Sequence, residues 1–196
     1  MRKTSTPSMC TIEPGGLFVL IYKTMKNTKS STKPQSSAST KSAHQTPTIV
    51  LASDHAGFAL KEAVKTFLKS EGYNTLDVGA HELVEGDDYP VYMAAAAMKV
   101  AEDLTGSTKA IIFGATGEGE AIVANRFPGV RAAVWNGGNE EIVELSRKHN
   151  DANVLSIGAH FVDEKTCLHI TELWLTTEFS EEERHKRRIA EIDNIE

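Results

Sequence analysis

The chain has 196 residues, of which 40% are hydrophobic and 24% are charged, a composition that argues against a fibrous or wholly disordered protein. No apolar run approaches the roughly 20 residues needed to cross a bilayer, so we expect no membrane partner. The net charge of −6 is uneven, because residues 1–46 carry seven Lys or Arg against one Glu, which leaves −12 on residues 47–196. An acidic body of this kind lacks the footprint of a nucleic-acid-binding protein.

Residues 1–46 are rich in Ser, Thr and Lys and poor in large apolar side chains. Such a segment buries too little surface to offset its ordering entropy, so we predict a disordered basic extension followed by one domain over residues 47–196. A Ser-rich basic leader is also typical of an organelle transit peptide, but Lys outnumbers Arg six to one here. Cys10 and Cys167 form no CxxC pair, and we expect a reducing, cytoplasmic environment.

From Thr48 onward short apolar runs alternate with helical spacing, the pattern of βαβ units. We predict strands at Thr48–Ala52, Thr75–Val78, Ala110–Phe113, Arg131–Trp135 and Val154–Ile157. The predicted helices are one with Leu60, Val64, Phe67 and Leu68 on a single face, then Tyr92–Leu104, Glu120–Asn125, Glu140–Lys148 and Glu164–Leu175. This order predicts a three-layer α/β/α sandwich with a five-stranded parallel, Rossmann-like sheet.

A last helix is predicted from Ser180 to about Ile195. Ser180 is its expected N-cap, and Glu183 stands three residues later, at capping-box spacing. Ligands of open α/β sheets bind beyond the carboxyl ends of the strands. The loops that follow the predicted strands are therefore where we look for functional residues.

The loop Gly114–Gly119 has three glycines between a strand and a helix, so its backbone N–H groups can face an anion. No Gly-Lys-Ser/Thr follows, and the first strand is not followed by the dinucleotide fingerprint. Glu120 comes just after this loop, where a carboxylate could act as a base beside donors for an enediolate oxygen. Alternatively, Glu118 or Glu120 only complements the helix dipole.

Three further groups have both a functional and a structural interpretation. His149 ends a helix and is expected on a loop at the edge of the sheet, as a proton shuttle or as a partner of the helix dipole. Asp54 and His55 follow the first strand, as ligand contacts or as a helix cap. Arg184 and Arg188 share one helical face, as a phosphate clamp or as a solvated stripe.

Taken together, these pieces resemble the ribose-5-phosphate isomerase B / galactose-6-phosphate isomerase family. The resemblance covers Thr48 to about Ile195, and its five motifs occur in the family's order. They are Ser53–Gly57, Asp88–Pro90, Ala124–Ala132, Leu145–Leu155 and Arg184–Arg188.

The resemblance implies a metal-free, cofactor-free interconversion of an aldose phosphate and a ketose phosphate through a cis-enediol. In one branch of the family the base is a Cys that opens the Gly-rich loop, where this chain has Gly114. In a second branch that position is Gly and the base is a Glu just after the loop, which corresponds to Glu120. Ribose 5-phosphate and ribulose 5-phosphate are the expected pair. A hexose 6-phosphate isomerase and a non-catalytic phosphosugar-binding module are the alternatives.

The resemblance also assigns a role to each remaining candidate residue. Thr116 and the amides of the loop, including Ala115, Gly117 and Gly119, would stabilise the enediolate. His149 would open the sugar ring, with Asn150 beside it. The other substrate contacts would be Asp54, His55, Asp88, Tyr89, Arg184, His185 and Arg188.

The family places its site at a dimer interface, with His149 contributed across it. We therefore expect a homodimer with shared active sites, with a tetramer as the further alternative. One departure concerns the phosphate: the family usually has Arg two residues after the Gly of the fifth strand, and this chain has His160. Imidazole is a weaker and pH-dependent phosphate partner.

Overall fold

The computed structural model describes residues 47–195. The expectation of a disordered segment at residues 1–46 lies outside the described residues. Five strands form one parallel sheet, and the elements alternate along the chain in the predicted order. The strands are β1 (Thr48–Ser53), β2 (Asn74–Asp77), β3 (Lys109–Gly114), β4 (Ala132–Trp135) and β5 (Val154–Gly158). The helices are α2 (Phe58–Ser70), α3 (Tyr89–Glu102), α4 (Glu118–Ala124), α5 (Glu141–Asn150), α6 (Glu164–Thr176) and α7 (Glu183–Asp193).

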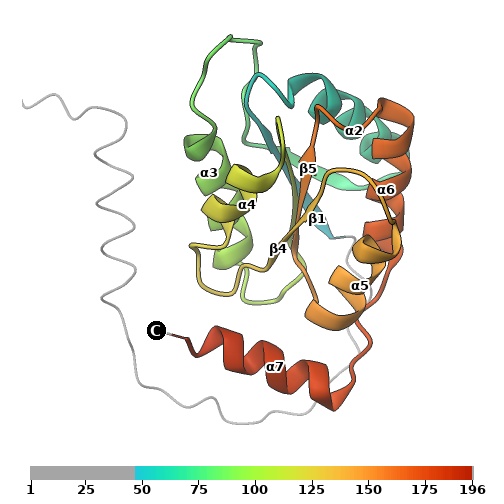
Figure 1. Cartoon of the computed structure of the whole chain (residues 1–196). Helices are drawn as coiled ribbons and strands as arrows, with labels where there is room; N and C mark the ends of the chain where they lie inside the picture. The colour runs from blue at the N-terminus through green and yellow to red at the C-terminus, as the bar shows by residue number, and fades with distance from the viewer. Residues whose placement is uncertain (1–46, 196) are drawn as a thin grey trace, which may run out of the picture. The chain divides into compact units, whose positions relative to one another are not determined.

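The sheet has the strand order β2-β1-β3-β5-β4, and every neighbouring pair is parallel. Helices cover both of its faces, with α3 and α4 on one side and α2, α5 and α6 on the other (Figure 1). The predicted α/β/α sandwich is therefore confirmed. None of the helices in residues 47–195 has the length and apolar character of a membrane span.

Two apolar cores hold the layers together, because successive side chains of a buried strand point to opposite faces. On β1, Ile49 and Leu51 pack toward α2 and α6, whereas Val50 and Ala52 pack toward α3. All four are fully buried. The continuous apolar run of β1 follows from its position in the interior of a parallel sheet that is covered on both faces.

Lys61 of α2 is a buried charge that ties this helix to the neighbouring β2. Its side chain has no exposed surface, and its Nζ donates to Asp77 Oδ2 and to the carbonyl of Ala80, both at 2.7 Å. An unpaired buried ammonium would be costly. The two acceptors offset that cost and fix the chain where it leaves β2.

The structure corrects the predicted start of the last helix. Glu181 has a left-handed backbone with φ of 56°, which interrupts the helical path between Ser180 and Glu183. The N-cap of α7 is Glu182, without a side-chain capping bond. Ser180 instead donates its backbone N–H to the carbonyl of Lys148 at 3.1 Å. The predicted Ser180 capping box was therefore wrong.

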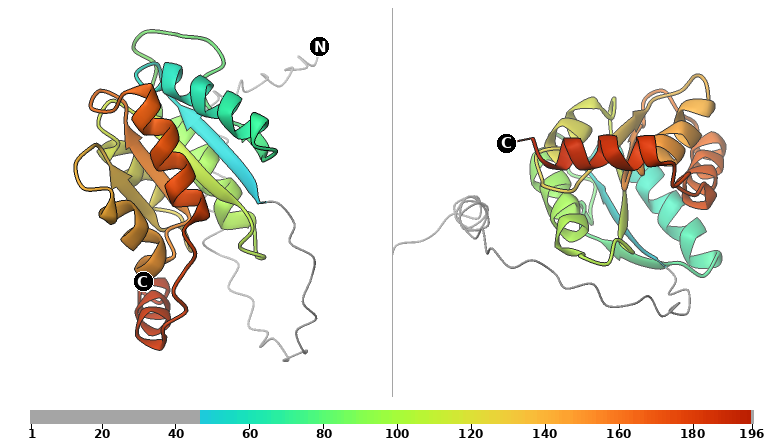
Figure 2. Two further views of the ribbon diagram at one scale, coloured as in Figure 1. Left: turned by 90° about the vertical axis from the view of Figure 1, so that its right-hand side faces the viewer. Right: turned by 90° about the horizontal axis from the view of Figure 1, so that it is seen from below.

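Two further differences concern where helices begin or end. The helix predicted from Tyr92 begins at Tyr89, because Pro90 fits the first turn, where no N–H is needed. His149, which we expected on a loop, lies in the last turn of α5. Seen from below, α7 runs across the base of the sheet, beside the end of α5 (Figure 2).

Candidate functional site

The carboxyl ends of β1 and β3 form the point where the sheet changes its winding. These strands are neighbours, but β1 is followed by α2 on one face and β3 by α4 on the other. Open α/β sheets bind their ligands at such a divergence. The structure brings the Asp54 loop and the Gly-rich loop together there.

Glu120 lies in the first turn of α4 and is 4% exposed. Burial raises the pKa of its carboxyl, and the negative charge of Asp54 raises it further. Its Oε2 has no hydrogen-bond partner among the described residues. The carboxylate occupies space beside Gly114, where a Cβ atom would come within 1.9 Å of Glu120 Oε1. A buried carboxylate with a raised pKa and one oxygen without a hydrogen-bond partner is suited to proton abstraction.

The Gly-rich loop is held through its carbonyl oxygens. The carbonyl of Gly117 accepts a bond from Ser156 Oγ at 2.6 Å, and that of Ala115 accepts one from the backbone of His160 at 3.1 Å. Gly117 adopts a left-handed φ of 80°, which glycine tolerates best. These bonds anchor the loop to β5 and to the loop that follows it.

Side chains from other loops border this carboxylate. A Cβ added at Gly119 would lie 2.8 Å from the Tyr89 hydroxyl, so Tyr89 packs directly against α4. Asp54 is 5% exposed and accepts backbone bonds from Ala56 at 3.0 Å and Gly57 at 3.2 Å. Asp54 therefore stabilises the turn before α2. It does not cap the helix, whose N-cap is Gly57.

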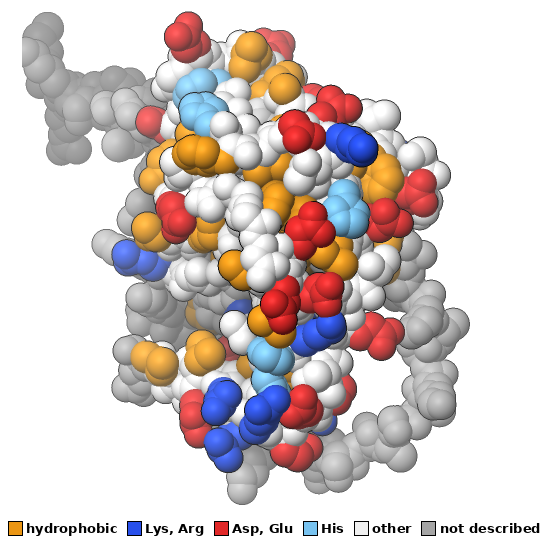
Figure 3. Space-filling model, turned by 45° about the vertical axis from the view of Figure 1, so that its right-hand side comes forward, with side chains coloured by type: hydrophobic (Ala, Val, Ile, Leu, Met, Phe, Trp, Pro, Cys, Tyr) orange, Lys and Arg blue, Asp and Glu red, His pale blue; other side chains and the backbone are white. Residues whose placement is uncertain are grey.

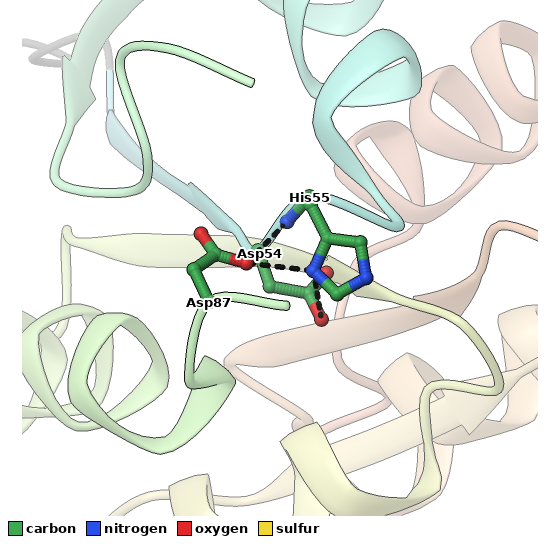
Figure 4. Close-up of side chains that lie close together, drawn as sticks. All are labelled: Asp54, His55 and Asp87. Carbon is green, nitrogen blue, oxygen red and sulfur yellow. Dashed lines mark hydrogen bonds and ion pairs between the residues drawn. The ribbon is translucent and has the colours of Figure 1, made fainter. Parts of the chain in front are cut away.

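His55 and Asp87 contact each other at this edge of the sheet (Figure 4). Asp87 Oδ1 lies 2.7 Å from His55 Nδ1 and accepts the backbone N–H of His55 at 2.9 Å. The contact is made by Asp87, which the sequence did not single out, and not by the predicted Asp88, which is exposed and forms no side-chain cap on α3. Nothing in the sequence Asp87-Asp88-Tyr89-Pro90 distinguishes one carboxylate from the other.

A second group of candidates lies at the other end of the sheet. His149 and Asn150 end α5 and precede β5, so they lie at the amino ends of the strands. The rings of His149 and His185 are 4.3 Å apart, and His185 Nδ1 donates to the carbonyl of His149 at 3.0 Å. His185 is 3% exposed. Within one protomer this group does not meet Glu120.

Arg184 and Arg188 are both exposed on α7. Arg184 Nε bonds to Glu182 at 2.8 Å. On the face drawn in Figure 3, most of the Lys and Arg side chains gather at the lower end, where α7 lies. This end of the molecule therefore presents permanent positive charge to solvent.

A cavity of about 690 Å³ also lies at the amino ends of the strands, and Lys109 and Arg147 line it. Burial lowers the pKa of Lys109 to about 8, and the nearby charge of Arg147 lowers it as well. No residue selected from the sequence lines this cavity. The cavity therefore lies at the opposite end of the sheet from Glu120.

The fold and the site define a class: an α/β protein with a buried carboxylate beside a Gly-rich loop, an arrangement suited to moving a proton on a small ligand. The model of the family described as Ribose/Galactose Isomerase matches residues 49–192. The chain belongs to this family of sugar-phosphate isomerases.

Relatives and solved structures agree with this assignment. Ribose-5-phosphate isomerase B from Mycolicibacterium paratuberculosis is 37% identical over 142 residues, which cover 72% of this chain and 86% of the relative. Ribose-5-phosphate isomerase B from Mycoplasma genitalium, solved with bound ribulose-5-phosphate, aligns with a TM-score of 0.72 and 33% identity over 76% of this chain and 96% of that one. Ribose-5-phosphate isomerase B from Clostridium thermocellum aligns with a TM-score of 0.68 and 38% identity, over 74% of this chain and 95% of that one.

Proposed function

We propose that the protein interconverts ribose 5-phosphate and ribulose 5-phosphate through a cis-enediol, with Glu120 as the base. The observation that carries this proposal is the buried Glu120 carboxylate, which lies beside a Gly-rich loop at the switch point of the sheet. The relatives named ribose-5-phosphate isomerase B support the choice of pentose phosphate. The compartment proposed is the cytoplasm, which the free thiol of Cys167 supports.

In this mechanism Glu120 removes the proton from C2 of the open-chain aldose. The electron pair forms the C1–C2 double bond, and negative charge develops on O1, where Thr116 and the loop amides stabilise it. Return of the proton to C1, with transfer of the O2 proton to O1, leaves a carbonyl at C2 and gives the ketose. The raised pKa of Glu120 brings its basicity closer to the working pH.

We infer that two protomers share each site. Glu120 lies at the carboxyl ends of the strands, whereas His149, Arg184 and Arg188 lie at the amino ends. A partner that presented its α5 and α7 to the carboxyl ends of the strands would supply the ring-opening histidine and the phosphate-binding arginines. The exposed apolar side chains Val91 and Ile122, on α3 and α4, would be covered in such an assembly.

The test is isomerisation of ribose 5-phosphate by the purified protein in excess chelator. Glu120→Gln keeps the shape of the side chain but removes its basicity, so kcat should fall at least about 100-fold. Glu118→Gln is the matched control, because Glu118 occupies the same helical turn but is exposed. Its kcat should stay within about twofold of wild type.

Equal loss of activity in the two variants would contradict the assignment of Glu120 as the base. The same assay with allose 6-phosphate and galactose 6-phosphate identifies the sugar by the relative kcat/KM. Binding of sugar phosphate without turnover of any of them would instead favour a non-catalytic binding module.

A further inference from the structure

The loops at the carboxyl ends of the five strands contain no Lys or Arg. They comprise residues 54–57, 78–88, 115–117, 136–140 and 159–163. The only side chains in them that can become positive are His55, His81 and His160. A phosphate that approaches this edge meets the buried carboxyl groups of Asp54 and Glu120. Within one protomer, a protonated histidine is the group of this edge that can offset their charge.

His55 is the histidine of this edge that the fold holds by a carboxylate (Figure 4). Asp87, which is 32 residues away in sequence, uses a single oxygen to accept both the Nδ1 and the backbone N–H of His55. The Asp87 side chain is 9% exposed and that of His55 is 34% exposed. Asp87 thus fixes the ring and the backbone of His55 together, while part of the ring stays open to a ligand.

The position of the ring proton follows from the state of Asp87. Burial raises the pKa of the Asp87 carboxyl, but the hydrogen bonds from His55 lower it further and hold it below its ordinary value. Asp87 is then an acceptor only, so Nδ1 must donate. Nε2 has no hydrogen-bond partner among residues 47–195, which leaves it as the nitrogen that can reach a ligand.

Several titratable groups set the charge of this ring. The bond to Asp87 raises the pKa of His55, burial lowers it, and the negative charges of Asp54 and Glu85 raise it further. Tyr92, from α3, faces Asp87, and the charge of Asp54 also acts on Glu120 of α4. The balance raises the pKa of His55 above its ordinary value, so the ring keeps its proton to a higher pH than a free histidine does.

We propose that Asp87 is a positioning residue of the isomerase. It holds the His55 ring by Nδ1, so that Nε2–H faces the bound sugar phosphate as a charged donor to a phosphate oxygen. The identity of the ligand rests on the proposed function, whereas the control of His55 by Asp87 does not.

The first experiment measures the pKa of His55 directly, by NMR titration of its ring C–H signals in the full chain without substrate. Asp87→Asn keeps an oxygen that can accept both bonds but carries no charge, so the pKa of His55 should fall by about one unit. Glu82→Gln is the matched control, because it removes one exposed negative charge from the same loop. It should shift the pKa of His55 by no more than about 0.2 unit. The spectrum of His55→Gln identifies the signal.

The second experiment compares KM for ribose 5-phosphate between wild type and Asp87→Asn from pH 5.5 to 8.5. The ratio of the two values should reach about tenfold near pH 8 and approach one near pH 5.5, where His55 is protonated in both proteins, while kcat changes by less than about twofold. Taking the ratio at each pH cancels the titration of the substrate phosphate. In a His55→Gln background, Asp87→Asn should have no further effect on KM.

An unchanged pKa of His55 in Asp87→Asn overturns the proposal. So does a KM ratio that is the same at every pH, because a merely structural role would produce that result. If wild type isomerises no sugar phosphate, the proposed function fails, and the NMR titration still decides whether Asp87 controls His55.

Discussion

Gly114 shows how one missing side chain can determine where the proposed catalytic base lies. It does not adopt a left-handed backbone, so its conformation alone does not require glycine. Space does: a Cβ would lie 1.9 Å from Glu120 Oε1 and 2.1 Å from its Cδ. Gly114 and Glu120 are therefore a matched pair, in which the absence of one side chain makes room for the other.

Gly114→Ala should therefore displace the Glu120 carboxylate and lower kcat by about 100-fold or more, as a misplaced base would. In a Glu120→Gln background, where the proposed base is already lost, the same change should lower kcat by less than about threefold. The measurement is kcat for all four proteins. Full additivity of the two losses would show that Gly114 acts independently of Glu120.

At the scale of elements, Arg147 joins three segments at the amino ends of the strands. It is 5% exposed, and its guanidinium donates to Thr177 O at 3.2 Å and to Asp151 Oδ1 and Ala152 O at 2.7 Å. These bonds connect the end of α6 and the start of β5 to α5. The planar fork of Arg reaches several acceptors at once, which Lys cannot reproduce.

Arg147→Met should lower the free energy of unfolding by about 2–4 kcal/mol, because two backbone carbonyls lose a charged donor. The ion pair with the partly exposed Asp151 adds little to this loss, since solvent screens it. Lys148→Met is the neighbouring control: its exposed ion pair with Glu144 should contribute less than about 0.5 kcal/mol. Urea denaturation measures both, and equal losses would contradict the role of Arg147.

The elements that the sequence predicted best are those whose pattern is local. The continuous apolar run of β1 predicts a buried strand, and the regular spacing of apolar residues in α2 predicts a helix. The predicted start of α7 was wrong because Glu181 has a left-handed backbone and Ser180 bonds to Lys148 of α5. No local sequence pattern predicts such a contact. Asp87 was missed for the same reason, since its partner His55 lies 32 residues away.

At the scale of the molecule, the candidate residues form two groups at opposite ends of one sheet. If two protomers share each site, a mixture of Glu120→Gln and His149→Ala protomers should regain activity that neither variant has alone. Random exchange makes half of the dimers mixed, and each mixed dimer has one intact site of two, so about a quarter of wild-type activity is expected.

The control for this mixing experiment replaces His149→Ala by the double variant Glu120→Gln/His149→Ala. The mixture then contains no intact site and should remain inactive. Co-refolding the two chains followed by the isomerase assay makes the measurement. Absence of recovery in the first mixture would mean that one protomer holds all the groups of its own site.

The attachment of α7 has a consequence for local unfolding. His185 is the only buried residue of this helix, so little apolar surface opposes its detachment from the body. Amide hydrogens along Glu183–Asp193 should therefore exchange with solvent through local opening, long before those of the central strands. A partner or ligand that binds the exposed arginines of this helix should therefore slow its hydrogen exchange. Exchange measured residue by residue along α7 would detect that binding.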